Sequence, residues 1–216
     1  MAALFHNSSF EQNSLNKSTN ENKINQLSRE IVIKKIYELQ KKKSYIISST
    51  GYISRQLYSE ANIKSKKNIK ILYSIGSMGH TASISLGINS TTKSEVIVID
   101  GDGSALMHLG SLSTTTYYSG KNYKYILINN GIHESVGGQP TNSFELNFKK
   151  ISEGLGFLNY MQLKKITDLD TKINSFLVST GPSFLEVIIK TKSSNELTRI
   201  KNLDLIKKKL ISAKFT

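Results

Sequence analysis

The sequence lacks cysteine altogether and is poor in acidic residues, in arginine and in long apolar runs. Without cysteine the chain has no disulfide, no zinc-thiolate ligand and no cysteine nucleophile, a composition compatible with a reducing cytoplasm. No apolar run approaches the roughly 20 residues that a membrane-spanning helix needs. We therefore predict a cytoplasmic protein without a membrane partner.

The scarcity of acidic residues leaves the chain strongly basic. It has 29 lysines and arginines against 16 acidic residues, a formal charge of +13, which by itself favours a nucleic-acid or anionic-membrane partner. Only Arg29, Arg55 and Arg199 are arginines, however, and bidentate recognition of phosphate or guanine prefers arginine. We interpret the charge as a solvated basic surface and predict no nucleic-acid partner. A nucleic-acid binder is the alternative, and its affinity would fall steeply with salt.

The length of 216 residues suits one α/β domain with tails. Residues 1–27 are polar and lack both an early basic cluster and a continuous apolar core, so they predict a disordered tail or linker rather than a secretory signal. Residues 28–194 then form the domain. Residues 195–216 carry leucine and isoleucine among lysines and predict a helix that docks on the domain, with a basic helix at a membrane surface as the alternative.

Short apolar runs alternate with amphipathic segments along the domain. This alternation predicts a three-layer α/β/α fold with a mostly parallel sheet. The expected strands cover residues 45–48, 69–75, 96–99, 125–128 and 183–189. The expected helices follow Ser28, Gly51, His80 and Ser104, and two more cover residues 148–158 and 169–178. The helix after Ser104 is expected to present one apolar face made of Leu106, Leu109, Leu112 and Tyr117.

The stretch from Val96 to Thr141 has the pattern of a strand, a helix and a second strand. Its first strand ends in Gly101-Asp102-Gly103 and its second ends in Asn129-Asn130. Because parallel strands end at one edge of the sheet, Asp102 and Asn130 are expected to face one small volume there. Carboxylate and amide oxygens suit Mg²⁺, and a helix N-terminus favours a phosphate. The stretch thus predicts a site for a metal ion and a diphosphate.

The same residues carry a family resemblance. Gly101-Asp102-Gly103, twenty-five intervening residues and then Asn129-Asn130 resemble the signature of enzymes that depend on thiamine diphosphate. Residues 76–80, 100–112 and 129–141 are similar, more narrowly, to phosphonopyruvate decarboxylases and next to sulfopyruvate decarboxylase β subunits. The resemblance runs from about Ser28 to the C-terminal region and covers only the diphosphate-binding (PP) half of such an enzyme. It implies the thiamine diphosphate-binding fold.

The resemblance also implies roles for particular residues. The metal ligands would be Asp102, Asn130 and the main-chain carbonyl of Ile132. The Gly76 carbonyl would accept a hydrogen bond from the 4′-amino group of the cofactor's pyrimidine, and Met78 would support the bend between its two rings. The other expected cofactor contacts are Thr50, Ser77, Gly101, Gly103 and Ser104, with Ser49 either a further contact or an ordinary helix cap.

Candidate substrate contacts lie around the same predicted site. His133, on a glycine-rich loop after the metal ligand, is the best candidate for a titratable catalytic group, and its alternative is to hydrogen-bond the loop only. His80 fits a helix start as well as an active-site position. Arg55 would add positive charge for a phosphonate or sulfonate, or else lie on the surface. The remaining candidates are Glu134, where relatives commonly have aspartate, Gly138 and Gln139.

The activity that the resemblance implies is that of a carboxy-lyase, which uses thiamine diphosphate and Mg²⁺ to decarboxylate a 2-oxo acid. Phosphonopyruvate, giving phosphonoacetaldehyde and CO₂, is the expected substrate, and sulfopyruvate is the alternative. Such an enzyme also needs a glutamate that the family places on a pyrimidine-binding domain. We therefore expect a pyrimidine-domain partner in a hetero- or homo-oligomer, or a longer chain of which this is a fragment. A non-catalytic cofactor-binding subunit is the other class of function.

Overall fold

The computed structural model describes residues 27–189, 197–201 and 203–212, and its strands form one six-stranded sheet. All strand pairs are parallel, in the order β2-β1-β3-β4-β6-β5. Residues 1–26 of the predicted tail lie outside the described residues, whereas Leu27 is buried in the core. The strands are β1 Ser44–Ser48, β2 Ile69–Tyr73, β3 Glu95–Gly101, β4 Tyr123–Asn129, β5 Asn159–Leu163 and β6 Ser183–Ile188.

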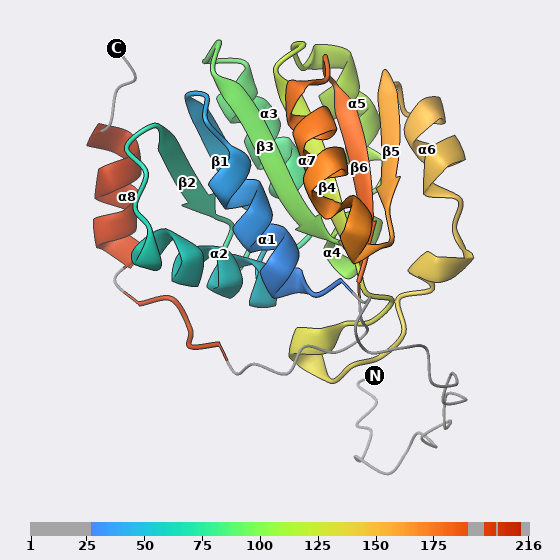
Figure 1. Ribbon diagram of the computed structural model, residues 1–216, viewed down its shortest axis with the longest axis horizontal. Helices are drawn as coiled ribbons and strands as arrows, with labels where there is room; N and C mark the ends of the chain where they lie inside the picture. The colour runs from blue at the N-terminus through green and yellow to red at the C-terminus, as the bar shows by residue number, and fades with distance from the viewer. Residues whose placement is uncertain (1–26, 190–196, 202, 213–216) are drawn as a thin grey trace, which may run out of the picture.

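Helices cover both faces of the sheet (Figure 1). One face carries α1 (Arg29–Leu39), α2 (Tyr52–Ile63) and α7 (Leu169–Val178). The other carries α3 (Thr81–Asn89), α4 (Asp102–Met107), α5 (Ser111–Tyr118) and α6 (Phe148–Gly154), and α8 (Leu203–Ser212) lies beside the edge strand β2. The prediction of a three-layer α/β/α fold is therefore confirmed. None of the helices within the described ranges is long and apolar enough to cross a bilayer.

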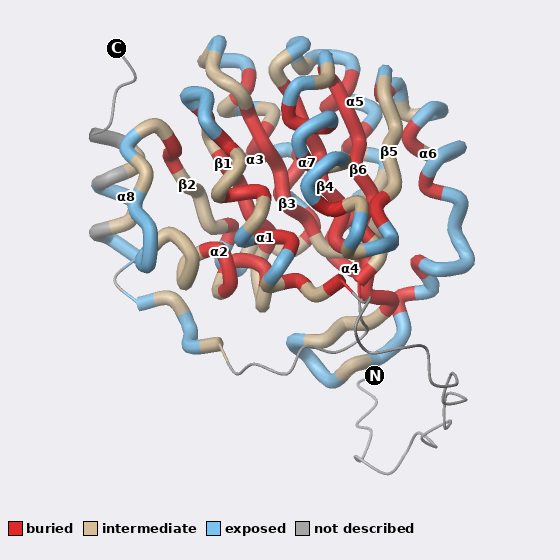
Figure 2. The backbone as a smooth tube through the Cα atoms, in the orientation of Figure 1, coloured by how far each residue is buried: buried red, intermediate tan, exposed pale blue. Residues whose placement is uncertain are grey.

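The inner strands are buried on both faces, which explains their uninterrupted apolar sequences. Along β3, Ile97 and Ile99 belong to the core under α1, α2 and α7, whereas Val96 and Val98 belong to the core under α3 to α6. These four side chains are fully buried, and the tube of β3 runs mostly in red through the centre of the molecule in Figure 2. Two separate hydrophobic cores thus hold the sheet rigid from both sides.

Helix α1 shows how capping sets the ends of an element. The Ser28 hydroxyl accepts a hydrogen bond from the Ile31 N–H at 3.3 Å, as the capping prediction requires. At the other end, Nζ of Lys66 reaches carbonyls of the last turn and of the capping residue Gln40, which have no partner within the helix itself. These carbonyls belong to Tyr37 at 2.8 Å, Glu38 at 2.8 Å and Gln40 at 3.0 Å.

Two predicted helices differ from the structure. The single helix expected between β3 and β4 is divided into α4 and α5, because His108 leaves the helical conformation and places Nδ1 3.2 Å from the Gly79 carbonyl oxygen. Tyr117, expected on a buried apolar face, is 81% exposed. The helix expected over residues 148–158 is shorter and ends as α6, since Gly156 soon afterwards adopts a positive φ of 94°.

One strand, β5, was not predicted from the sequence. It lies at the edge of the sheet and pairs only with β6 among the described strands, with Asn159 opposite Ser183. Apart from Leu163, its residues are only partly buried, so the segment lacks the apolar run that marks the inner strands. A strand with one open side gives a weaker sequence pattern.

The chain changes its direction across the sheet at β1. It passes from β1 to β2 on one side and then returns to β3 on the other side of β1. Open α/β sheets bind ligands at such switch points, beyond the carboxyl ends of the strands. In Figure 1 the yellow loop of residues 131–147 covers this edge of the sheet.

Candidate functional site

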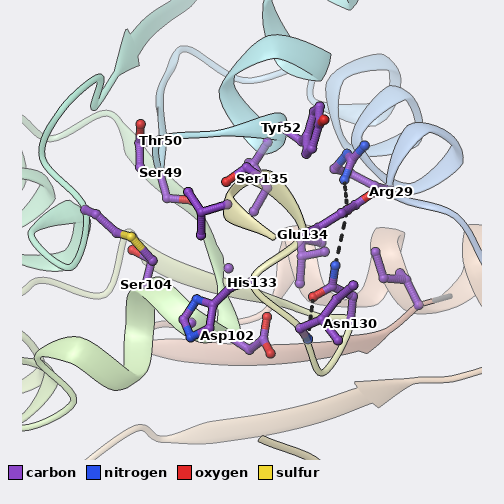
Figure 3. Close-up of a pocket in the computed structure, with 18 residues that line it drawn as sticks. Arg29, Ser49, Thr50, Tyr52, Asp102, Ser104, Asn130, His133, Glu134 and Ser135 are labelled. Carbon is purple, nitrogen blue, oxygen red and sulfur yellow. Dashed lines mark hydrogen bonds and ion pairs between the residues drawn. The ribbon is translucent and has the colours of Figure 1, made fainter. Parts of the chain in front are cut away.

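A cleft opens at the carboxyl ends of β1, β3 and β4, and most of the predicted site residues line it (Figure 3). Arg29 and Tyr52 line it as well, although neither was among the predicted site residues. The predicted residues in the lining are Thr50, Met78, Gly101, Asp102, Gly103, Ser104, Asn130, Ile132, His133 and Glu134. The predicted residues outside the lining are Arg55, Gly76, Ser77, His80, Gly138 and Gln139, and their roles stay predictions.

The Asp102 carboxylate is buried and is held from one side. Its Oδ2 atom accepts hydrogen bonds from the hydroxyls of Thr141 and Ser143, the latter at 2.8 Å. Oδ1 accepts no hydrogen bond from any residue that the structure describes. Because the two hydroxyls hold Oδ2, Oδ1 is the oxygen that a metal ion can take.

Asn130 lines the same cleft from the end of β4. Its Oδ1 accepts a hydrogen bond from the Ile132 N–H at 3.2 Å, and its Nδ2 donates to Oε2 of Glu134 at 3.2 Å. These two bonds fix the orientation of the amide. The cleft therefore joins the carboxylate and the amide that the motif spacing predicted to lie at one edge of the sheet.

Asn129 points away from the cleft, because neighbouring side chains of a strand alternate between its faces. It is fully buried and donates to Oε1 of Glu186 at 3.0 Å, and its Oδ1 lies 2.7 Å from the Ser143 hydroxyl, whose one proton it shares with Oδ2 of Asp102. The same hydroxyl faces Asp102. The first asparagine of the pair thus supports the aspartate through Ser143, while the second faces the ligand site.

The turn after β1 contains two hydroxyl residues with different surroundings. Ser49 is buried, and its hydroxyl hydrogen-bonds the Asp100 carboxylate. Thr50 lines the cleft, and its hydroxyl has no hydrogen bond to any of the described residues. The Thr50 hydroxyl is therefore available to bind a ligand, whereas the Ser49 hydroxyl is engaged with Asp100.

Asp100 lies beneath the cleft floor and was not among the predicted site residues. Its carboxylate accepts hydrogen bonds from the Tyr125 hydroxyl at 2.7 Å and from the Gly101 N–H at 2.9 Å, and the hydroxyls of Ser104 and Ser49 also donate to it. Burial nevertheless raises the pKa of Asp100, since loss of water outweighs these donors. The carboxylate ties the ends of β1 and β3 to the first half of β4. The feature of the sequence that could have identified Asp100 is an acidic residue at the end of a buried apolar strand.

Ser104 joins α4 to the turn of residues 76–80. Its hydroxyl oxygen accepts a hydrogen bond from the Gly79 N–H at 3.0 Å. The bond holds this turn beside α4, and Met78 reaches the cleft lining from it. Gly76 begins this turn with a positive φ of 77°, a conformation that suits glycine.

His133 lies against Gly103 of the Gly101-Asp102-Gly103 motif. A Cβ atom on Gly103 would come within 2.5 Å of Nδ1 and Cε1 of the His133 ring, so only glycine fits there without movement. The loop is closed by the His133 N–H, which donates to the Gln139 carbonyl at 2.8 Å, and by the Gly138 N–H, which donates to the His133 carbonyl at 2.9 Å. The main chain thus fixes His133 at the cleft wall.

Two candidate substrate residues lie elsewhere. Arg55 lines a separate hollow beside α2, where its Nη1 donates to the Leu197 carbonyl at 3.3 Å. His80 is exposed and stacks on His108 with ring centroids 4.5 Å apart. Neither side chain belongs to the lining of the cleft.

Arg29, the first residue of α1, brings a positive charge to the cleft instead. It is 3% exposed, its Nη1 lies 2.5 Å from Oε2 of Glu134, and its guanidinium lies 4.8 Å from the centroid of the Tyr52 ring. The sequence carried little signal for this role, because the periodicity of a helix predicts which face is buried but not what that face meets.

The donors in the cleft suit a hard divalent cation with a diphosphate. They are one carboxylate oxygen, one amide oxygen, main-chain groups and the free hydroxyl of Thr50. Within the described ranges, no three His, Cys, Asp or Glu side chains gather closely enough to hold a metal by themselves. A small set of protein oxygens completed by phosphate oxygens is typical of Mg²⁺. The residues present therefore fit a magnesium diphosphate group.

Comparison with known proteins relates the chain to one family and one fold. Residues 49–187 match the family described as thiamine pyrophosphate enzyme, C-terminal TPP binding domain. A structure from Mycobacterium smegmatis, assigned as a thiamin diphosphate-dependent enzyme, superposes with a TM-score of 0.62 at 14% identity. The superposition covers 79% of this chain and 34% of that chain, and it concerns the fold alone.

Curated relatives are similar in sequence over much of the chain. The phosphonopyruvate decarboxylase of Streptomyces hygroscopicus is 33% identical over 156 residues, which cover 72% of this chain and 38% of the relative. The sulfopyruvate decarboxylase subunit beta of Methanocaldococcus jannaschii is 42% identical over 126 residues, which cover 58% of this chain and 64% of the subunit. The corresponding subunit of Methanothermobacter thermautotrophicus is 32% identical and is covered over 73% of its length. The chain thus spans well under half of the phosphonopyruvate decarboxylase.

Proposed function

This chain belongs to the thiamine pyrophosphate enzymes, and on that premise we propose that it is the diphosphate-binding half of a 2-oxo acid decarboxylase. The proposed substrate is phosphonopyruvate, which loses CO₂ to give phosphonoacetaldehyde. A pyrimidine-domain partner supplies the activating glutamate and completes the site, and we place the assembly in the cytoplasm. The observation that carries the proposal is the single cleft that Asp102 and Asn130 line together at the switch point of the sheet.

The chain's own residues bind and orient the cofactor in this proposal. Oδ1 of Asp102, the Asn130 amide oxygen and the Ile132 carbonyl would hold Mg²⁺, which would neutralise charge on the diphosphate. The Thr50 hydroxyl and the main chain of residues 101–104 hold the diphosphate. When bound, thiamine diphosphate supplies the electron sink that a 2-oxo acid needs in order to lose CO₂.

The groups at the other end of the cleft act on the rings and the substrate. Met78 would support the bend of the cofactor, and His133 would move a proton to or from the substrate. The carbonyl of Gly76, on the same turn as Met78 but outside the cleft lining, would accept a hydrogen bond from the cofactor's amino group. The contact between His133 and Gly103 supports this assignment, since it keeps the imidazole at the cleft wall.

A second candidate is the β subunit of a sulfopyruvate decarboxylase, because this chain matches a larger part of such a subunit than of a phosphonopyruvate decarboxylase. The match covers 64% of one such subunit but only 38% of the phosphonopyruvate decarboxylase. A sulfonate and a phosphonate require similar cationic or N–H donors. Decarboxylation assays with both acids, after addition of the pyrimidine-domain partner, distinguish the two substrates by their kcat/KM.

Calorimetric titration with thiamine diphosphate and Mg²⁺, in the presence of the partner, tests the cofactor assignment. We expect binding by the wild-type chain that Asp102→Ala abolishes and that Asp170→Ala, on the exposed face of α7, leaves intact. No binding by the wild-type assembly would favour a non-catalytic scaffold. Full decarboxylase activity of the purified chain alone would contradict the need for a partner.

A further inference from the structure

The buried guanidinium of Arg29 has more hydrogen-bonding capacity than its surroundings use. Its Nη1 pairs with the Glu134 carboxylate at 2.5 Å, while the buried Nε and Nη2 atoms have no partner within the part of the chain that the structure describes. Arginine carries five N–H donors in a planar fork, and leaving a charged donor buried and unpaired costs more than leaving a neutral one. Such a group in the wall of a cleft is suited to bind an anion.

The Tyr52 ring positions this guanidinium without satisfying its N–H groups. The ring offers its π-face to Arg29 at 4.8 Å and to Arg55 at 5.0 Å. Arg55 already donates to a main-chain carbonyl outside the cleft. Of the arginines that the structure describes, Arg29 is therefore the one whose charge reaches the cleft.

Glu134 joins Arg29 to the proposed metal ligand. Its Oε2 accepts from Arg29 and, at 3.2 Å, from Nδ2 of Asn130, as the dashed lines in Figure 3 show. The same figure shows Arg29 and Ser104 on opposite sides of the cleft, and Ser104 is bonded to the turn that carries Met78. If Met78 supports the rings, Arg29 lies at the opposite end of the cleft, where the diphosphate would bind.

Resting on the proposed function, we propose that Arg29 binds the outer phosphate of the cofactor's diphosphate through Nε and Nη2, while Glu134 holds Nη1 and keeps a negative charge beside this phosphate site. Arginine is well suited to bidentate contact with phosphate oxygens, and its two unpartnered nitrogens provide the donors. Two anions at one guanidinium repel each other, so the charge of the Glu134 carboxylate weakens the binding of the phosphate. The substrate's own acidic group binds elsewhere, near the rings.

The test compares thiamine diphosphate with thiamine monophosphate, which lacks the outer phosphate. Both are titrated calorimetrically, with Mg²⁺, into the chain assembled with its pyrimidine-domain partner. Arg29→Gln is expected to weaken diphosphate binding roughly tenfold to a hundredfold and to leave monophosphate binding nearly unchanged. Glu134→Gln removes the competing charge and is expected to tighten diphosphate binding. Lys34→Gln, an exposed position of the same helix, controls for the loss of one positive charge.

Several outcomes would overturn the assignment. They are an unchanged diphosphate affinity in folded Arg29→Gln, an equal loss for both thiamine phosphates, or a raised KM for the 2-oxo acid with unchanged cofactor affinity. If circular dichroism shows that Arg29→Gln is unfolded, Glu134→Gln decides alone, and an affinity that does not rise rejects the proposal. A wild-type assembly with no affinity for thiamine diphosphate rejects the proposed function and this inference together, whereas binding that Arg29→Gln leaves intact rejects only the inference.

Discussion

The hydroxyl of Ser143 lies 2.8 Å from Oδ2 of Asp102, although the serine comes 41 positions later in the chain. It also lies 2.7 Å from Oδ1 of Asn129, so it ties the loop after β4 to the ends of both inner strands. By holding Oδ2, this serine and Thr141 leave Oδ1 of the aspartate toward the cleft. The orientation of the proposed metal ligand thus depends on a residue outside the Gly101-Asp102-Gly103 motif.

Ser143→Ala removes this hydroxyl and leaves Thr141 to hold the Asp102 carboxylate. We expect binding of Mg²⁺ with thiamine diphosphate to weaken roughly tenfold, because the ligand is less well oriented. Calorimetry on the assembly with the pyrimidine-domain partner measures this. Ser83→Ala, at an exposed position of α3, is the matched control. A Ser143→Ala protein with wild-type affinity would show that Thr141 alone suffices.

Gly103→Ala is expected to disturb the cleft, because the added Cβ would lie 2.5 Å from Nδ1 and Cε1 of His133. Such overpacking lowers the free energy of unfolding by about 1–3 kcal/mol. Gly87→Ala should have the opposite effect, since a Cβ there meets nothing within 4 Å and the residue lies within α3. There we expect a gain of about 0.5–1 kcal/mol. Urea denaturation of both variants measures the two signs, and equal effects would refute the argument.

Asp100 should make stability depend on pH. Burial raises the pKa of this carboxyl above its ordinary value of 3.8, so the folded chain keeps a proton that the unfolded chain has already lost. The contribution of the carboxyl to stability is therefore complete below 3.8 and declines as the pH rises toward the raised folded pKa.

The measurement for Asp100 compares the wild-type protein with Asp100→Asn from about pH 4 upward. The free energy of unfolding of the wild type, relative to that of the variant, is expected to fall as the pH rises. A relative stability that rises with pH would mean that the hydrogen bonds from Tyr125, Ser104 and Gly101 outweigh the loss of water at Asp100.

Lys66→Met tests how α1, and with it Arg29, is held. The ammonium group donates to three carbonyls at the end of the helix, and its loss leaves them without these donors. We expect the free energy of unfolding to fall by about 1–2 kcal/mol. Lys67→Met, next in the chain and exposed, should leave stability within about 0.5 kcal/mol of the wild type. Chemical denaturation compares the two, and similar losses would argue against a specific role of Lys66.

The sequence by itself determined the class of fold and the edge of the sheet at which the site lies. Inner strands such as Val96–Ile99 are apolar on both faces, and this pattern is local enough to be read without coordinates. Parallel strands then bring Asp102 and Asn130 to one edge whatever the details of packing. The partly polar edge strand β5 and the break between α4 and α5 escaped prediction, because neither has a strong local pattern.

Only the tertiary structure decided which side chains meet across the cleft. Arg29 pairs with Glu134 across 105 positions of sequence, and Ser143 turns back to Asp102 from the loop over the site. Periodicity identifies a buried helix face, but the partner of each buried residue depends on how α1 and the loop settle against the same sheet. This packing between distant segments places the Arg29 guanidinium in the wall of the cleft. It places the Arg55 guanidinium over the Tyr52 ring but outside the cleft lining.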